Sequence, residues 1–210
     1  MSAVEIFGIA PSTYTRAVRM ACEEKGVAYE LIHTMPQTPE ALALHPFGKI
    51  PILRHNGIVI PESKAIVAYL DKVFDGPTLI PTEPRALAQA EEWVSHVNTV
   101  IDRTMVREYI FAYFFPKTAD KSPDRPAIDA CLADLRAQVG ILDKAVAPTG
   151  CLAGNQYSFA DMNLMPILAY VRMFPEGAEA IGGAPALAAY YQRHAQRPSF
   201  KNTIPPPPAR

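Results

Sequence analysis

The 210-residue sequence lacks the segments that place a protein in or across a membrane. Its start, Met1 to Glu5, has neither the basic stretch nor the apolar stretch of a secretory signal peptide. No apolar run approaches the roughly 20 residues that a helix needs to span a bilayer. Both absences predict a cytoplasmic protein with no membrane partner.

Cysteine is scarce, and the three present, Cys22, Cys131 and Cys151, lie far apart in the chain. They form neither a disulfide framework nor a Cys-x-x-Cys redox centre, and an odd number suits a reducing compartment. The five histidines lack the spacing of metal ligands, so no metal site is predicted. Gly48 and Gly57 are isolated and do not form a glycine-rich phosphate loop.

A charge excess of either sign is also missing. The formal net charge is -1, from 20 Lys and Arg against 21 Asp and Glu. Such a balance creates no overall field that would attract nucleic acid, so we expect no nucleic-acid partner. Proline, by contrast, is abundant, with 21 residues, about twice the usual share. Four of them are consecutive near the C-terminus, so residues 205–210 are predicted to form an extended tail.

Strand and helix signals alternate in the first part of the chain. The predicted strands are residues 4–8, 27–33, 52–54 and 58–60, and the predicted helices lie at about 12–25 and 61–74. The last two strands flank Asn56-Gly57, the strongest short-range signal for an antiparallel hairpin. The order βαβ-ββα predicts an α/β domain over residues 1–76.

The rest of the chain predicts helices only. Residues 77–85 form the natural linker, and residues 86–204 are predicted to be an all-α domain. Its expected helices cover about 85–115, 124–147, 158–174 and 185–196. Ser158 and Asp161 have the spacing of a capping box at the start of the third.

Three local features of the first domain could carry chemistry. Ser12 stands at a strand-to-helix turn, where unpaired N–H groups and the helix dipole stabilise an anion such as a thiolate. Ile50-Pro51 enters a strand, and a free edge there could pair with an extended peptide ligand. Glu62-Ser63 opens a helix, where Ser63 suits a ligand carboxylate and Glu62 a ligand ammonium. Each also has a purely structural interpretation, as a helix cap or a strand-starting proline.

Together these segments resemble the glutathione transferase superfamily over almost the whole chain. The segments that carry the resemblance are residues 8–19, residues 23–30, His45-Pro46-Phe47-Gly48-Lys49-Ile50-Pro51, Pro61-Glu62-Ser63-Lys64-Ala65-Ile66, and residues 153–161. His45 departs from the usual Asn of its segment, whose last proline is cis in the family. The resemblance implies a thioredoxin-like N-terminal domain and an all-α C-terminal domain.

The resemblance also implies a catalytic residue. Tyrosine-type members place their catalytic Tyr on the first strand, where this chain has Phe7. Ser12 and Arg16 match the Ser-x-x-x-Arg pattern of theta-like and phi-like members, so Ser12 is expected to activate the thiol of glutathione. Thr13 and Tyr14 remain alternatives.

Glutathione is the implied co-substrate. The residues expected to bind it are Lys49, Ile50, Pro51, Glu62 and Ser63. Ile50 would pair with the cysteinyl unit, Glu62 and Ser63 would hold the γ-glutamyl end, and Lys49 could reach a carboxylate. Gln37 is the candidate for the glycyl carboxylate, because no Lys or His lies near it in residues 35–38.

An apolar electrophile is the implied second substrate, as in detoxification. The expected pocket residues are Ile9, Ala10, Met35, Met105, Tyr109 and Tyr113. The helix that begins at Arg85 would pack across a two-fold axis in a homodimer. Two alternatives stay open: a glutathione-dependent dehalogenase, lyase or peroxidase, and a binding or scaffold protein without turnover.

Overall fold

The computed structural model describes residues 3–207 and divides into two compact units. The first contains the chain up to Pro81 together with the residues from Ala195 onwards, and the second is Thr82–His194. The predicted domains differ from this division at the C-terminal end, where residues 195–204 were expected in the helical domain. Within the described residues, no helix is long and apolar enough to cross a membrane.

A four-stranded mixed sheet organises the first unit. Its strands are β1 (Val4–Gly8), β2 (Tyr29–His33), β3 (Ile52–His55) and β4 (Ile58–Pro61), in the order β2-β1-β3-β4. β1 is parallel to β2 and antiparallel to β3, which is antiparallel to β4. Asn56 and Gly57 both have positive φ, 49° and 81°, as the predicted two-residue hairpin turn requires.

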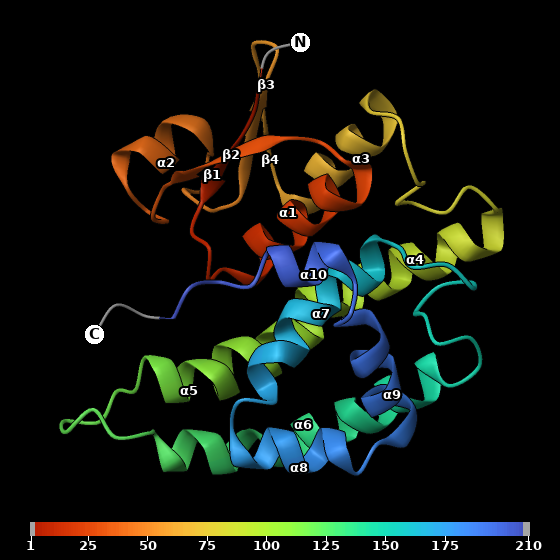
Figure 1. The fold of residues 1–210 in the computed structure, drawn as a ribbon. Helices are drawn as coiled ribbons and strands as arrows, with labels where there is room; N and C mark the ends of the chain where they lie inside the picture. Colours follow the sequence, from red (N-terminus) through yellow and green to blue (C-terminus); the bar gives the residue numbers. More distant parts are fainter. Residues whose placement is uncertain (1–2, 208–210) are drawn as a thin grey trace. The chain divides into compact units, whose positions relative to one another are not determined.

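Three helices cover this sheet. α1 (Thr13–Lys25) and α3 (Ser63–Val73) pack together on one face, and α2 (Pro39–Leu44) lies on the other (Figure 1). α1 buries Ala17, Val18 and Ala21, and it ends at Gly26, whose φ of 65° is the left-handed conformation that glycine adopts without strain. The predicted βαβ-ββα order is confirmed.

The chain returns to the first unit after the second. Residues Pro198–Asn202 form a short helix, α10, beside α1 (Figure 1). Arg16 Nη2 donates to the carbonyl of Phe200 at 3.1 Å, and Arg197 forms two bonds to the Glu24 carboxylate at 2.7 and 2.6 Å. These long-range bonds explain why residues from Ala195 onwards group with the first compact unit. Of the predicted tail, residues 205–207 are described without helix or strand, and residues 208–210 lie outside the described residues.

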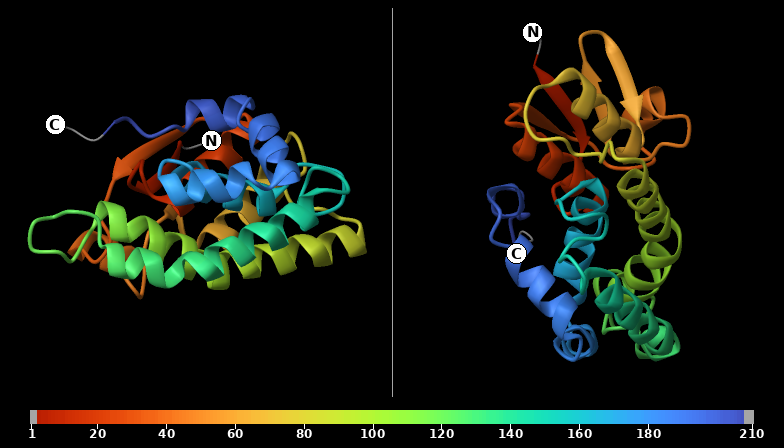
Figure 2. Two further views of the ribbon diagram at one scale, coloured as in Figure 1. Left: turned by 90° about the horizontal axis from the view of Figure 1, so that it is seen from below. Right: turned by 90° about the vertical axis from the view of Figure 1, so that its right-hand side faces the viewer.

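The described residues of the second unit form helices and no strand, as predicted. Its helices are α4 (Pro84–His96), η1 (Val97–Ile110), α5 (Phe111–Phe114), α6 (Arg125–Val146), α7 (Phe159–Val171), α8 (Pro175–Gly182) and α9 (Pro185–His194). The first three join into one long helical stretch, with the wider π geometry in η1. This stretch and α6 run side by side (Figure 2).

The predicted capping box at the start of α7 is confirmed. Asp161 is fully buried, and its Oδ2 accepts the Ser158 N–H at 2.9 Å. Its Oδ1 accepts the N–H of Leu152 at 2.9 Å and the hydroxyl of Tyr190 at 3.0 Å. One carboxylate therefore fixes the start of α7 and ties it to the preceding loop and to α9.

Candidate functional site

Ser12 caps the first helix of the first unit. Its hydroxyl oxygen accepts the N–H of Thr15 at 3.3 Å, and its carbonyl accepts the N–H of Arg16 at 2.9 Å. Because the oxygen is the acceptor in this cap, the hydroxyl hydrogen can still be donated to a ligand. Ser12 is half-buried, whereas Thr13 is buried. Of these two, Ser12 is the more accessible donor.

The Ile50-Pro51 bond is cis, as the resemblance implied. β3 begins only at Ile52, so Ile50 precedes the ladder. Among the described residues, no protein group hydrogen-bonds to the backbone N–H or C=O of Ile50. Those groups are what an extended peptide ligand would need for main-chain pairing. Lys49 is exposed beside them.

Glu62 and Ser63 form the start of α3. Ser63 is buried at the first helical position, where backbone N–H groups lack partners within the helix. Glu62 has a φ of 71°, and its side chain is 63% exposed. Non-glycine residues rarely have a positive φ. Those that do occur often at functional sites.

The sheet register brings these three segments to one end of the sheet. Phe7 pairs with Ile52, and Ile52 pairs with Pro61. Ser12 follows the end of β1, Ile50-Pro51 precedes the start of β3, and Glu62-Ser63 follows the end of β4. Since β3 is antiparallel to both neighbours, its start lies beside both of their ends. Main-chain groups, two helix N-termini and a carboxylate therefore converge there.

Gln37, in the segment that follows β2, is hydrogen-bonded to the loop that leads to Ile50. Gln37 Nε2 donates to the carbonyl of Phe47 at 2.7 Å, and the backbone N–H of Gln37 donates to the carbonyl of Gly48 at 2.8 Å. The amide donors of Gln37 are thus directed at the loop that leads to Ile50. The structure gives Gln37 a role in supporting this loop.

The six predicted pocket residues are distributed over both units. Ile9 and Ala10 are half-buried, and Met35 is exposed, in the first unit. In the second, Met105 and Tyr109 are fully buried. Tyr109 donates its hydroxyl to Glu176 at 3.1 Å and accepts the N–H of Gly177 at 2.9 Å. Met105 and Tyr109 therefore pack in the core of the second unit.

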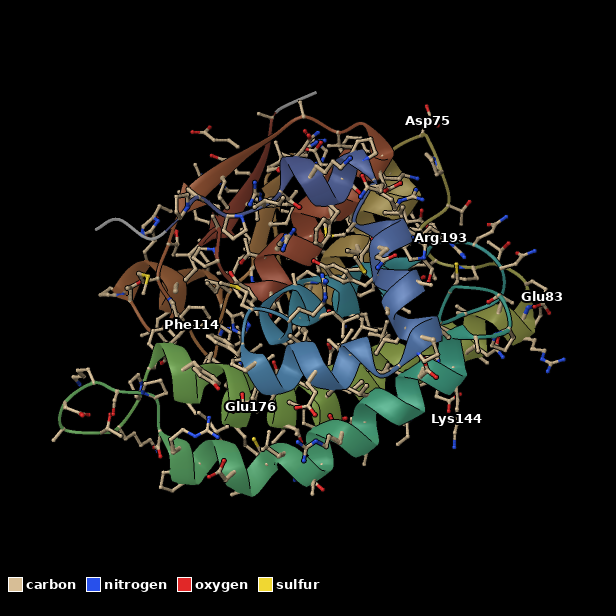
Figure 3. The ribbon with its side chains drawn as sticks, turned by 60° about the horizontal axis from the view of Figure 1, so that its bottom comes forward. Asp75, Glu83, Phe114, Lys144, Glu176 and Arg193 are labelled. Carbon is tan, nitrogen blue, oxygen red and sulfur yellow. The ribbon has the colours of Figure 1, made fainter. Side chains whose placement is uncertain are left out.

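Tyr113 is also held by Glu176, which lies on α8 (Figure 3). The two oxygens are 2.6 Å apart, and the Tyr113 ring stacks on Phe174 with centroids 3.8 Å apart. Burial, with a further contribution from Glu176, raises the pKa of Tyr113 to about 12. Burial likewise raises the pKa of Tyr109. Neither phenol is poised to ionise at neutral pH.

Cysteine and metal chemistry find no support among the described residues. The three cysteines are buried and form no disulfide, and burial raises the pKa of Cys22 to about 12. No group of three or more His, Cys, Asp or Glu side chains in residues 3–207 could hold a metal ion. Any thiolate at the site must come from a ligand.

Sequence reasoning assigned no role to His45, which the structure places within this site. The residue is 2% exposed, and its Nε2 lies 3.4 Å from the Glu62 carboxylate. The signals in the sequence were its position as the first residue of the segment ending in Ile50-Pro51 and its departure from the usual Asn there.

Comparison with known proteins identifies the family. Residues 6–78 match the model of the glutathione S-transferase N-terminal domain, and residues 106–198 that of the C-terminal domain. A probable glutathione S-transferase from Solanum tuberosum is 30% identical, with 77% of this chain and 70% of that protein covered. A stringent starvation protein A homolog from Haemophilus ducreyi is 29% identical, with 97% and 90% covered.

Comparison with solved structures leads to the same family. The theta class glutathione S-transferase from Xanthomonas axonopodis pv. citri, solved with glutathione bound, is 27% identical and matches with a TM-score of 0.83 over all of both chains. The chain therefore belongs to the glutathione S-transferase superfamily. Its architecture is the fold of that superfamily, a thioredoxin-like unit and an all-helical unit.

Proposed function

We propose that this protein is a glutathione S-transferase in which Ser12 activates the thiol of bound glutathione. The observation that carries the proposal is the convergence of Ser12, the cis Ile50-Pro51 bond and Glu62-Ser63 at one end of the sheet. The family relatives and the glutathione bound to the Xanthomonas structure support it. Ser12 with Arg16 also fits a theta-like or phi-like serine subgroup of bacterial type.

Thiol acidity sets the energetic requirement. A free thiol has a pKa near 8.5, so only a few per cent is nucleophilic thiolate at neutral pH. Lowering that pKa by about two units requires nearly 3 kcal/mol of preferential thiolate stabilisation. A charge-assisted hydrogen bond contributes roughly 1.5–3 kcal/mol and a helix N-terminus about 0.3–1 kcal/mol. The Ser12 hydroxyl and the start of α1 together can supply this stabilisation of the thiolate.

Each part of glutathione has a partner in this proposal. The backbone of Ile50, presented by Pro51, pairs with the cysteinyl unit, and Ser63 holds the γ-glutamyl carboxylate at the start of α3. Glu62 faces the γ-glutamyl ammonium, and Lys49 reaches a glutathione carboxylate. These residues lie in the glutathione-binding domain, which we propose spans residues 1–76.

The thiolate then attacks the electrophile. A carbon–sulfur bond forms while the leaving group departs with the bonding electron pair. Ile9, Ala10, Met35 and Tyr113 remain candidates for contacting an apolar electrophile, since apolar and adaptable side chains suit broad specificity. By analogy with the family, we propose a cytoplasmic homodimer that packs through the helix beginning near Arg85.

Product analysis tests this function. Purified protein is incubated with glutathione and, separately, an activated aryl halide, a dihaloalkane and a hydroperoxide. Mass spectrometry should find a stable thioether carrying the intact glutathionyl group. Release of halide with free glutathione returned would indicate a dehalogenase, and oxidised glutathione a peroxidase.

A scaffold without turnover is the second candidate, because one relative is named for stringent starvation and not for a transferase. Glutathione binding without any product would favour that alternative.

A further inference from the structure

His45 joins two segments of the site through both nitrogens of its ring. Its backbone is fixed first: the N–H donates to the carbonyl of Ala41 at 2.8 Å, and the carbonyl accepts the N–H of Gly48 at 2.9 Å. The residue therefore ends α2 and begins the turn towards Ile50-Pro51. With its side chain buried, the imidazole has a defined orientation.

One hydrogen bond of the ring defines its tautomer. Nδ1 accepts the N–H of Phe47 at 3.0 Å, so Nδ1 carries no proton. The ring proton of the neutral imidazole is then on Nε2. Nε2 lies 3.4 Å from Oε1 of Glu62, so the ring nitrogen that carries the proton lies beside that carboxylate.

The backbone and the carboxylate of Glu62 both require neighbouring groups to fix their conformation. Its φ of 71° is sparsely populated by non-glycine residues and persists where neighbouring groups enforce it. Its side chain makes no capping bond to α3 and is 63% exposed. A free carboxylate of this kind samples several rotamers, and ordering it when a ligand binds costs affinity.

We propose that His45 is a positioning residue, which orients the Glu62 carboxylate for the ammonium group of the γ-glutamyl end of glutathione. The inference rests on the proposed function, because that function supplies the ligand. The usual Asn of this segment can place an oxygen where Nδ1 lies and accept the Phe47 N–H. Its shorter side chain cannot reach Glu62. The substitution by His thus adds a link that Asn does not provide.

Two variants separate the functions of the two ring nitrogens. His45→Asn keeps an acceptor for Phe47 but loses the contact with Glu62. His45→Gln keeps an N–H at the position of Nε2 but loses the acceptor. Calorimetry measures the Kd of each for glutathione and for glutaryl-Cys-Gly, which is glutathione without its α-amine. Thermal melts by circular dichroism check that each variant folds.

The expected result is selective. His45→Asn should weaken glutathione binding by about three- to tenfold, the loss expected for one polar contact, and leave glutaryl-Cys-Gly binding unchanged. His45→Gln should retain most of the preference for the amine. Adding Glu62→Gln to His45→Asn should weaken glutathione binding no further than Glu62→Gln alone.

Equal weakening of both ligands by His45→Asn would overturn the proposal, since it would show a general effect on the loop. An unchanged Kd for glutathione would overturn it too. If wild-type protein binds no glutathione, the proposed function itself fails and this role fails with it.

Discussion

Arg16 of α1 holds Phe200 of α10 in two ways. Its Nη2 donates to the carbonyl of Phe200 at 3.1 Å, and its guanidinium carbon lies 4.1 Å from the centroid of the Phe200 ring. Arg16 is buried and belongs to α1, the helix that Ser12 caps. The charge that follows Ser12 by four residues therefore anchors the C-terminal segment.

Replacing Arg16 by Met should lower the free energy of unfolding by about 2–4 kcal/mol, because the buried carbonyl of Phe200 would lose a charged donor. Urea denaturation followed by circular dichroism measures the change. Arg103→Met is the matched control, since the Arg103 side chain is 68% exposed, and its midpoint should stay near that of wild type. Equal effects of the two substitutions would refute the anchoring role.

Two glycines in helices give opposite predictions for the same substitution. A Cβ on Gly177 would lie 2.1 Å from the carbonyl oxygen of Val171, which is backbone and cannot move aside cheaply. A Cβ on Gly140 of α6 would meet nothing within 4 Å. Gly177→Ala should lower the melting temperature, whereas Gly140→Ala should stabilise by about 0.5–1 kcal/mol. Stabilisation by both would contradict the packing at Gly177.

Because of Glu176, the free energy of unfolding should depend on pH in the acid range. Burial raises its pKa, but hydrogen bonds from Tyr113 and Arg125 outweigh burial and hold that pKa at about 2. A carboxyl group with a lowered pKa stabilises the fold above its unfolded pKa, about 4.3, and this contribution is lost as pH falls towards 2. Because Arg125 is half-exposed, we expect the ionised Glu176 carboxylate to contribute only about 1–2 kcal/mol to the free energy of unfolding.

The measurement compares wild type with Glu176→Gln by urea denaturation at neutral pH and in steps below pH 4.3. The difference in unfolding free energy should shrink steadily as the pH falls through that window. A difference that stays constant would show that the ionised carboxylate is not the source of stability.

Lys49 is exposed beside Ile50, so its contribution to glutathione binding should be electrostatic. Lys49→Met should raise the Kd for glutathione at low ionic strength, and the gap to wild type should narrow as salt is added. Lys64→Met is the control, because Lys64 is also exposed near the site but has no proposed ligand contact. A gap that is insensitive to salt would argue against a charge contact.

Much of the fold could be predicted because its signals are local. Asn56-Gly57 accommodates two positive φ values, and Gly26 ends α1 through its left-handed conformation. Ser158 and Asp161 form a capping box within four residues. The three site segments also carry local signals, as helix caps and a strand-starting proline, but their role follows from the resemblance to the family, and the sheet register then explains their convergence.

The remaining features depend on contacts between distant residues. The burial of Tyr109 depends on such a contact, because its hydroxyl donates to Glu176, which lies 67 residues away. α10 has only five residues, and it is held by Arg16 from 184 residues earlier. His45 acquires its contact with Glu62 only when β3 and β4 form their hairpin. No periodic pattern in the sequence predicts which distant residues form such contacts.

The most direct test of the account is a pH titration of the thiolate absorbance of enzyme-bound glutathione. Wild type is compared with Ser12→Ala, and with Thr13→Ala and Tyr14→Phe as controls on the same helix turn. We predict a thiol pKa of about 6–7 in wild type and both controls, and a return towards about 8.5 in Ser12→Ala. A low pKa that persists in Ser12→Ala would contradict the role of Ser12 as the thiolate donor.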